Sequence, residues 1–309
     1  MAATVTTSPD WSASGASSRF DEYRPHVPSD LSPELDELAA MVSNGGVAVL
    51  SGAGISTQSG IPDYRGPSGA AMRKHAPMTY QTFTRDPIAR RRYWARGFLG
   101  WRQIEKARPN PGHLAVAALE RAGYVSGVIT QNVDGLHSEA GSVSTIDLHG
   151  RLDRVVCLDC GVVVPRVDVH DRIRAANLNW QAVATAINPD GDVDVPEDQL
   201  DEFVVVDCAS CGGVLKPDVV YFGEQVPTDR VAAAFDLTES ATALLVLGSS
   251  LQVYSGRRFV MRASARGIPV AIVNDGETKA DDLATIRIHG ELSQVLGRVV
   301  GQVETSISA

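Results

Sequence analysis

The chain has 309 residues, 44% of them hydrophobic, and carries a net charge of −9. This length and apolar content suffice for one large domain, or for one large and one small domain. The negative charge argues against a general nucleic-acid or membrane-surface binder, and the longest apolar runs are too short to cross a membrane. Residues 1–30 are rich in Ala, Ser, Thr and Pro and lack the pattern of a secretory signal, so they are predicted to be a disordered tail of a cytoplasmic protein.

The first structured part of the chain is predicted to be an amphipathic helix over residues 31–43 and a buried strand over residues 46–50. Gly52 and Gly54 follow this strand, where the absence of a Cβ lets the backbone turn tightly and come close to a ligand. Backbone N–H groups in such a turn can bind phosphate. Thr57 stands where the dinucleotide fingerprint has its third glycine, so the glycine pair alone is a weak signal.

The segment 61–65, Ile-Pro-Asp-Tyr-Arg, strengthens this signal. It places a carboxylate, an aromatic ring and a guanidinium side by side, which is too specialised a set for an ordinary connector. We therefore expect a binding site around residues 52–66.

Seven arginines occur between Arg85 and Arg108, interspersed with aromatic residues. One interpretation is a solvated helical face whose aromatic residues pack inward, and the other is a role in ligand or acyl recognition. The solvated face is favoured, because runs of charge are usually solvated. The aromatic residues in question are Tyr93, Trp94, Phe98 and Trp101. A second helix is predicted over residues 113–122, closed by Gly123.

Polar or small side chains follow each of the next predicted strands. In chain order they are Gln131, Asn132 and Asp134 after residues 125–130, His149 after 144–148, Gly248, Ser249 and Ser250 after 243–247, and Asn274 and Gly276 after 269–273. Parallel open sheets place ligand contacts at such strand ends. A single histidine is more often structural than catalytic, but a position between a strand end and a glycine favours catalysis for His149.

The four cysteines form two Cys-x-x-Cys pairs, Cys157 with Cys160 and Cys208 with Cys211. Two identical spacings predict one tetrahedral zinc ion rather than four unrelated thiols. Four thiolate ligands leave no open position, so the zinc is expected to be structural.

The 47 residues between the pairs exceed the usual zinc-ribbon interval. Residues 168–206 are therefore predicted to be an insertion with its own helix over 171–186. The acidic run 190–194 lacks the terminal Glu of an EF-hand loop and is interpreted as a solvated turn.

Residues 216–224 are predicted to be an extended edge strand or linker that can pair with a peptide backbone. Further helices are predicted over 231–240 and 291–303. Alternating strands and helices indicate an α/β fold, a doubly wound parallel sheet of Rossmann type with an inserted small zinc-binding domain. The predicted division is a larger domain from 31–150 and 217–303, a small domain at 151–216, and a helical segment at 65–108.

Over residues 31 to 300 the chain resembles the sirtuins, NAD-dependent protein lysine deacylases. The resemblance depends on several motifs in the family's order: Gly52-Ala53-Gly54-Ile55-Ser56, Gly60-Ile61-Pro62-Asp63-Tyr64-Arg65, Thr130 to His137, His149-Gly150, the two cysteine pairs, Val219 to Glu224, and Gly248-Ser249-Ser250-Leu251. The insertion between the cysteine pairs and the sequence of residues 92–96 resemble class II sirtuins. That subgroup includes an enzyme described as a lipoamidase and ADP-ribosyltransferase.

The resemblance implies that NAD is consumed as a co-substrate and that the partners are acyl-lysine proteins or peptides, with no nucleic acid and no membrane. It implies His149, Asn132 and Asp134 as catalytic residues. The implied NAD-binding residues are Gly52, Ala53, Gly54, Ile61, Asp63, Tyr64, Arg65, Gln131, Asn132, Asp134, Gly248, Ser249, Ser250, Asn274, Gly276 and Leu292. The implied substrate-binding residues are Val219, Val220, Phe222 and Gly223.

Alternatives to lysine deacylation are mono-ADP-ribosyltransfer, a lipoamidase-type activity on long acyl chains, and a non-catalytic NAD-binding module. The presence of His149 together with Asn132 and Asp134 argues against the last, since a binding module needs no base. Tyr93 and Arg96 resemble the Tyr-x-x-Arg pair with which some sirtuins select acidic acyl chains. The surrounding residues are more similar to the lipoamidase subgroup, so acetyl or extended neutral acyl chains are predicted to be preferred over succinyl.

Overall fold

Six parallel strands form the main sheet of the computed structural model, in the order β3-β2-β1-β7-β8-β9. The structure describes residues 32–63, 77–182, 193, 195–196 and 199–307. The strands are β1 (Val47–Ser51), β2 (Val125–Thr130), β3 (Thr145–Asp147), β7 (Ala243–Leu247), β8 (Val270–Val273) and β9 (Ile286–Ile288). The strand order reverses between β1 and β7, which is where Rossmann-type sheets open a crevice for their ligand. The predicted doubly wound sheet is confirmed.

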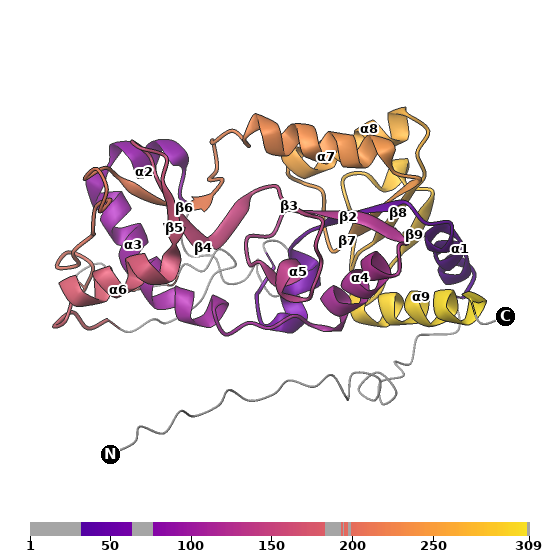
Figure 1. Ribbon diagram of the computed structural model, residues 1–309, viewed down its shortest axis with the longest axis horizontal. Helices are drawn as coiled ribbons and strands as arrows, with labels where there is room; N and C mark the ends of the chain where they lie inside the picture. The colour runs from indigo at the N-terminus through magenta and orange to yellow at the C-terminus, as the bar shows by residue number, and fades with distance from the viewer. Residues whose placement is uncertain (1–31, 64–76, 183–192, 194, 197–198, 308–309) are drawn as a thin grey trace, which may run out of the picture.

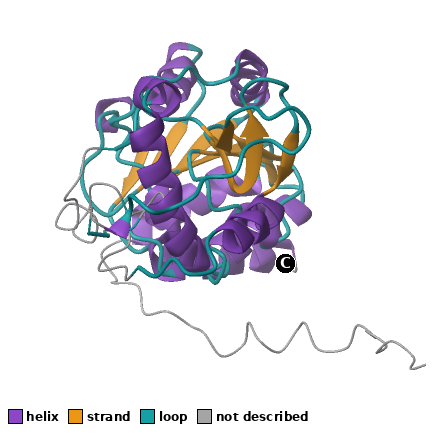
Figure 2. Cartoon of the chain, turned by 90° about the vertical axis from the view of Figure 1, so that its left-hand side faces the viewer, coloured by secondary structure: helices purple, strands orange, loops and turns teal. Residues whose placement is uncertain are grey.

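Helices cover both faces of this sheet, as Figure 2 shows. On one face lie α1 (Ser32–Ser43), α4 (Pro111–Arg121) and α9 (Leu292–Ile307), and on the other α7 (Thr228–Ser240) and α8 (Tyr254–Ala265). Within β1, Val49 belongs to the first core and Leu50 to the second, because successive side chains of a strand point to opposite faces. Burial on both faces explains why these strands are almost wholly apolar. Neither α8 nor β9 is anticipated by the sequence-based predictions above.

A second lobe is built on an antiparallel sheet of three strands, β5-β4-β6 (Figure 1). Its elements are β4 (Gly150–Cys157), β5 (Val163–Pro165), β6 (Leu215–Val219), α2 (Tyr80–Arg85), α3 (Pro87–Ile104) and α6 (Arg166–Ala176). Short elements elsewhere are η2 (Ala53–Ser59), α5 (Leu136–Glu139) and η4 (Asp281–Leu283). β6 is an edge strand, as the sequence predicts. α2 and α3 precede β2 in the chain yet pack into the core of the small lobe with β4 and β6.

The aromatic residues of α3 turn inward as predicted, with Trp94 fully buried and its indole N–H donating to Leu215 O at 3.1 Å. The prediction of a solvated arginine face is wrong in part. Arg91 and Arg92 are half-buried, and their guanidinium groups lie 3.4 and 3.9 Å from the carboxylate of Asp201. One side of α3 is buried in the core of the small lobe, and the aliphatic parts of the arginine side chains pack against neighbouring loops, which leaves them half-buried.

The helix predicted over 171–186 is found as α6, five residues earlier at its start, at Arg166–Ala176. Pro165 stands at its N-cap, where a fixed φ and the lack of an N–H are tolerated. Asn177 ends the helix, because its side chain binds Ile173 O, Val204 O and Val204 N. Periodicity alone does not reveal this loop pairing. The predicted tail 1–30 and most of the acidic run 190–194 lie outside the described residues.

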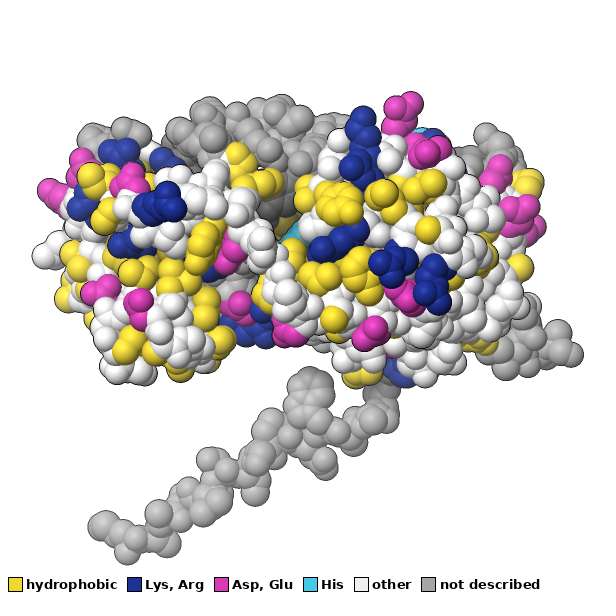
Figure 3. All heavy atoms as spheres, turned by 90° about the horizontal axis from the view of Figure 1, so that it is seen from above, with side chains coloured by type: hydrophobic (Ala, Val, Ile, Leu, Met, Phe, Trp, Pro, Cys, Tyr) yellow, Lys and Arg dark blue, Asp and Glu magenta, His cyan; other side chains and the backbone are white. Residues whose placement is uncertain are grey.

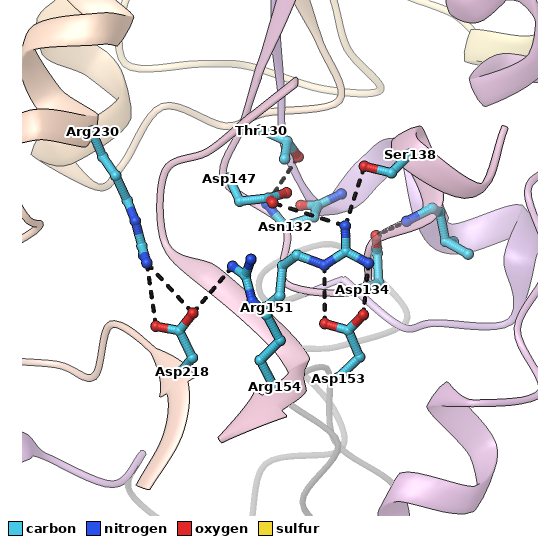
Figure 4. Close-up of polar contacts among 11 residues, drawn as sticks. Thr130, Asn132, Asp134, Ser138, Asp147, Arg151, Asp153, Arg154, Asp218 and Arg230 are labelled. Atoms are coloured by element: carbon cyan, nitrogen blue, oxygen red, sulfur yellow. Dashed lines mark hydrogen bonds and ion pairs between the residues drawn. The ribbon is translucent and has the colours of Figure 1, made fainter. Parts of the chain in front are cut away.

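The two lobes are joined at Gly150, whose φ is 82°. A Cβ there would lie 2.0 Å from Asp218 O, so no other residue fits. Figure 4 shows the carboxylate of Asp218 between Arg154 of the small lobe, at 3.1 Å, and Arg230 of α7, at 3.2 Å. This charge cluster links the start of β4 to the large lobe. None of the helices among the described residues is long and apolar enough to cross a bilayer.

Candidate active site

A cavity of about 980 Å3 lies at the carboxyl ends of β1, β2, β7 and β8. The space-filling view of Figure 3 shows the surface hollowed between the two lobes. The predicted site residues on the cavity wall are Gly52, Ala53, Gly54, Asp63, Gln131, Asn132, His149, Val220, Phe222, Gly223, Gly248, Ser249, Ser250, Asn274, Gly276 and Leu292. Segments separated by more than 200 residues therefore meet around one space.

Three glycines form the part of the wall at the crevice between β1 and β7. Gly54 N–H donates to Gly248 O at 2.8 Å. A Cβ on Gly52 or Gly54 would lie 2.8 Å from backbone atoms of Gly248, and a Cβ on Gly248 would lie 2.6 Å from Ile55 N. Two backbone segments meet here with no side chain between them. The N–H groups of Gly52, Gly54 and Gly248 donate to the carbonyls of Leu247, Gly248 and Val273, so this contact sets the shape of the wall and lets a ligand come close to the backbone.

Asn132 and Asp134 are tied together through Ser56. Asn132 Nδ2 donates to Gly52 O at 3.0 Å and to Ser56 Oγ at 3.1 Å. Ser56 Oγ donates to Asp134 Oδ2 at 2.7 Å, while Leu136 N–H donates to Oδ1 at 2.9 Å. Burial raises the pKa of Asp134, and these hydrogen bonds, together with the charge of Arg151, act against that rise. Asp134 thus lies behind the wall and acts on the cavity through Ser56 and Asn132.

Two buried histidines lie directly beneath this group, with ring centroids 5.0 Å apart. Because Ser56 donates its hydroxyl proton to Asp134, its Oγ accepts a hydrogen bond from His113 Nε2 at 3.4 Å. Likewise Ser51 donates to Thr130 Oγ1 and therefore accepts from His137 Nε2 at 2.9 Å. Burial lowers the pKa of His113 to about 4 and that of His137 to about 3. Both rings are therefore neutral hydrogen-bond donors at neutral pH, a role that sequence motifs do not disclose.

His149 lies at the end of β3, where its ring contacts two groups. Its Nδ1 is 2.9 Å from Gln131 O and its Nε2 is 2.8 Å from Ser255 Oγ. Burial lowers the pKa of His149, and the positive charges of Arg258 and Arg230 lower it further, while the Gln131 carbonyl acts in the opposite direction. The imidazole is neutral at neutral pH and faces the cavity, as a general base requires.

Some predicted site residues lie away from the cavity wall. Ile61 and Val219 are buried in the small-lobe core, next to residues that do line the cavity. Tyr64 and Arg65 lie outside the described residues.

The predictions also missed the wall formed by Val253, Tyr254 and Ser255 at the start of α8. Just before it, Leu251 has φ 53°, the one positive φ of a non-glycine residue in the described part of the chain. Such strained positions gather near functional sites. Residues 251–254 are Leu, Gln, Val and Tyr, so no run of small polar residues marks this wall in the sequence.

The four cysteines come together at one end of the small lobe, with all four sulfurs within 4.8 Å of one another. The Sγ atoms of Cys157 and Cys211 are 3.5 Å apart, and those of Cys160 and Cys208 are 3.8 Å apart. A tetrahedral zinc ion about 2.3 Å from each sulfur spaces its ligands about 3.8 Å apart. The four sulfurs therefore fit a zinc ion.

Comparison with known proteins identifies the family. Residues 52–255 match the model of the Sir2 family. The chain belongs to the Sir2 family. It is 56% identical over 275 residues to NAD-dependent protein deacetylase 1 of Streptomyces coelicolor, covering 89% of this chain and 90% of that protein.

Solved Sir2-family structures share the fold. A complex of Sir2 with a p53 peptide and NAD+ is similar with a TM-score of 0.70 and 30% identity, over 88% of this chain and 99% of that one. Sir2Af2 bound to a myristoylated histone peptide is similar with a TM-score of 0.63 and 28% identity, over 90% of this chain and 99% of that one. The Rossmann-type sheet found here is thus that of the Sir2 family.

Removal of one zinc ligand tests the metal centre. In this Sir2-family chain we expect Cys208→Ser to lose zinc and to destabilise the small lobe, because structural zinc contributes directly to folding. The intact protein should contain one zinc per chain by elemental analysis. Fluorescence of the buried Trp94, next to β6, should report early unfolding of the variant. Ser210→Ala, in the same turn, is the matched control, and folded active protein without zinc contradicts the assignment.

The buried histidines predict how stability depends on pH. Their pKa values in the folded protein, about 4 for His113 and about 3 for His137, lie below the 6.5 of an exposed histidine, so the unfolded chain binds more protons as the pH falls below 6.5. Each should lower the free energy of unfolding by up to about 1.4 kcal/mol per pH unit between pH 6.5 and its folded pKa. The raised pKa of Asp134 acts in the opposite direction at lower pH.

Urea unfolding at pH 7, 6, 5 and 4.5 measures this slope. His137→Gln should give a shallower slope than the unsubstituted chain, since one of the two titrations is removed. His289→Gln, at an exposed position, is the control and should leave the slope unchanged. Equal slopes in all three proteins would show that His137 does not titrate as inferred.

Proposed function

We propose that this chain, an NAD-dependent protein deacylase, transfers the acyl group of an acyl-lysine to ADP-ribose with His149 as the general base. The observation that carries the assignment is the neutral imidazole of His149 on the wall of the same cavity as the glycine contact and Asn132. A base, a phosphate-binding backbone and an amide-binding side chain are what the reaction needs in one place.

The cavity divides into regions that suit the parts of NAD. The pyrophosphate is assigned to the wall beside the glycine contact, where Ala53, Gly54 and Ser249 lie, and Ser249 offers a hydroxyl. Asn274 lies where the adenosine ribose belongs, after β8, with its own Nδ2 held on Gly276 O at 3.0 Å. These assignments follow the position of ligands at strand ends in Rossmann-type sheets.

Nicotinamide is assigned to the region around Asn132. Because Asn132 Nδ2 donates to Gly52 O and Ser56 Oγ, its carbonyl oxygen is oriented by both bonds and can accept from the nicotinamide carboxamide. Asp134 fixes this arrangement through Ser56, and Asp63 lies on the same wall. The rigid amide would recognise the leaving group before and after its release.

The acyl-lysine peptide is assigned to the segment that follows β6, which turns where Glu224 N–H donates to Tyr221 O at 3.0 Å. Val220 N–H donates to His149 O at 2.8 Å, so this segment runs directly beside the base. Phe222 is 45% exposed and, like Gly223, lines the cavity. β6 is an edge strand, and an edge strand favours pairing with a peptide backbone, which would guide the lysine side chain into the cavity.

In the proposed reaction the acyl carbonyl oxygen attacks ribose C1′ as nicotinamide leaves. A ribose hydroxyl then attacks the acyl carbon, and His149 Nε2 takes the proton of that hydroxyl. The lysine amine takes up a proton and leaves the acyl carbon, and a water molecule restores the hydroxyl on C1′, so that the acyl group ends on a ribose oxygen of ADP-ribose. The lowered pKa of His149 keeps the ring neutral at neutral pH, and the contact of Nδ1 with Gln131 O leaves Nε2 without a proton. The zinc ion is assigned a structural role only, since its four thiolate ligands leave no open position. A cytoplasmic location and the absence of nucleic-acid and membrane partners remain predictions.

His149→Ala tests the base. Deacylation should fall by at least about a hundredfold, the usual loss when a general base is removed. NAD binding, measured by calorimetry, and the thermal midpoint should change little, and His289→Ala serves as the control. Near-normal deacylation by His149→Ala would contradict the role of His149 as the general base. Nicotinamide release without acyl peptide would instead point to transfer of ADP-ribose to another acceptor.

The acyl group is proposed to be acetyl or a longer neutral chain. Tyr93 is buried, with its ring 5.5 Å from Phe83 and 5.3 Å from Tyr221, and it is Tyr221 that lines the cavity. A phenol packed among aromatic rings is poorly placed to clasp a carboxylate together with Arg96. The myristoylated peptide in the similar Sir2Af2 complex agrees with room for a long chain.

Acetyl, lipoyl and succinyl forms of one peptide test the acyl preference. We expect kcat/KM for the succinyl peptide to be the lowest of the three, and Arg96→Met to leave the ranking unchanged. A preference for succinyl that disappears in Arg96→Met would place Tyr93 and Arg96 in the acyl pocket.

A further inference from the structure

The two hydrogen bonds of His149 determine which ring nitrogen carries the proton. Nδ1 is 2.9 Å from Gln131 O, and a carbonyl oxygen can only accept, so Nδ1 is protonated. Since the lowered pKa of His149 keeps the ring neutral, Nε2 carries the lone pair. Ser255 Oγ, 2.8 Å from Nε2, therefore donates its hydroxyl proton to the nitrogen that must act as base.

Ser255 is held firmly in this position by the first turn of α8. The N–H groups of Gly256 and Arg257 donate to Val253 O at 3.2 and 3.1 Å. Arg258 Nε donates to Ser255 O at 3.0 Å. The hydroxyl thus projects from a hydrogen-bonded turn rather than from a free loop.

The same turn packs against the other hydrogen-bond partner of the base. A Cβ on Gly256 would lie 2.4 Å from Oε1 of Gln131, so the absence of a side chain at residue 256 lets α8 contact Gln131 without moving its amide. Gln131 Nε2 is itself held by Ser249 Oγ at 2.9 Å. Gln131 O and Ser255 Oγ, which bind the two sides of the imidazole, are therefore fixed relative to each other.

We propose that Ser255 is a positioning residue for acyl transfer, which holds His149 with its Nε2 lone pair directed into the cavity until a ribose hydroxyl takes the place of the serine. The inference rests on the proposed role of His149. The imidazole is clamped between a carbonyl that fixes the tautomer and a hydroxyl that fixes the direction of the lone pair. In many catalytic sites a base is likewise oriented by a hydrogen bond to one ring nitrogen while the other nitrogen contacts a hydroxyl.

The reaction order predicts which step depends on Ser255. Cleavage of nicotinamide precedes the action of the base, whereas acyl transfer to the ribose hydroxyl requires it. Ser255→Ala should therefore lower kcat for deacylation about tenfold, as expected from losing one orienting hydrogen bond in a reacting site. The rate at which labelled nicotinamide exchanges into NAD in the presence of acyl peptide should stay within about twofold of the rate of the unsubstituted chain. The KM values for NAD and for the peptide should also stay within about twofold, because Ser255 acts after both have bound.

Two further variants and a spectroscopic measurement sharpen the test. Ser255→Thr keeps the hydroxyl and should recover most of the lost kcat, while Ser264→Ala, on the same helix, is the matched control and should behave as the unsubstituted chain. Nitrogen-15 NMR of labelled histidine should show the Nδ1–H tautomer of His149 in both proteins, because the bond to Gln131 O is kept. The Nε2 signal should shift in Ser255→Ala, because the hydrogen bond from Ser255 Oγ is lost.

The outcomes separate failure of this inference from failure of the proposed function. If His149→Ala still deacylates, the role of His149 itself is wrong. If His149→Ala is inactive but Ser255→Ala keeps its kcat and the Nε2 signal of His149, Ser255 does not position the base. Equal losses of nicotinamide exchange and of deacylation in Ser255→Ala would also overturn the inference, because they would indicate a general disruption of the site. An increase in kcat would overturn it as well, because Ser255 would then hinder His149 rather than position it.

Discussion

The active site depends on the close contact between Gly52, Gly54 and Gly248. At the crevice of the sheet, the segments after β1 and β7 approach until a single Cβ would collide with backbone atoms 2.6 to 2.8 Å away. This approach allows Gly54 N–H to bond Gly248 O and gives a wall made of backbone. Two polar side chains of the cavity are held next to this wall: Asn132 Nδ2 donates to Gly52 O, and Gln131 Nε2 donates to Ser249 Oγ. The backbone contact of the three glycines therefore determines where these side chains lie.

Beneath the wall, polar groups are buried in a fully directed arrangement. His113 and His137 donate to Ser56 and Ser51, which in turn donate to Asp134 and Thr130. Hydrogen bonds between buried polar groups fix their geometry, although Nδ1 of His137 is buried without a partner. The region proposed for nicotinamide therefore holds the amide of Asn132 in one orientation, and the buried histidines make it sensitive to acid.

The proposed base, His149, lies at the junction of the two lobes. It follows β3 of the large lobe, and Gly150 begins β4 in the small lobe, next to the cluster of Asp218, Arg154 and Arg230 (Figure 4). The backbone carbonyl of His149 also accepts the N–H of Val220, at the start of the segment proposed to bind the peptide. A residue in this position contacts both lobes at once, which suits the proposal that it acts between NAD and the peptide.

The sequence by itself determined the sheet, the cavity edge and the metal centre. Apolar strands, the polar residues at their ends and the paired cysteine spacings are local patterns, and local patterns report strand burial and ligand type directly. The tertiary structure alone decided that α2 and α3 join the small lobe, that His113 supports Ser56, and that Ser255 meets His149. Ser255 and His149 are 106 residues apart, and their contact arises from the packing of α8 against Gln131. No local pattern encodes such a contact, because it depends on how separate elements pack once the fold has formed.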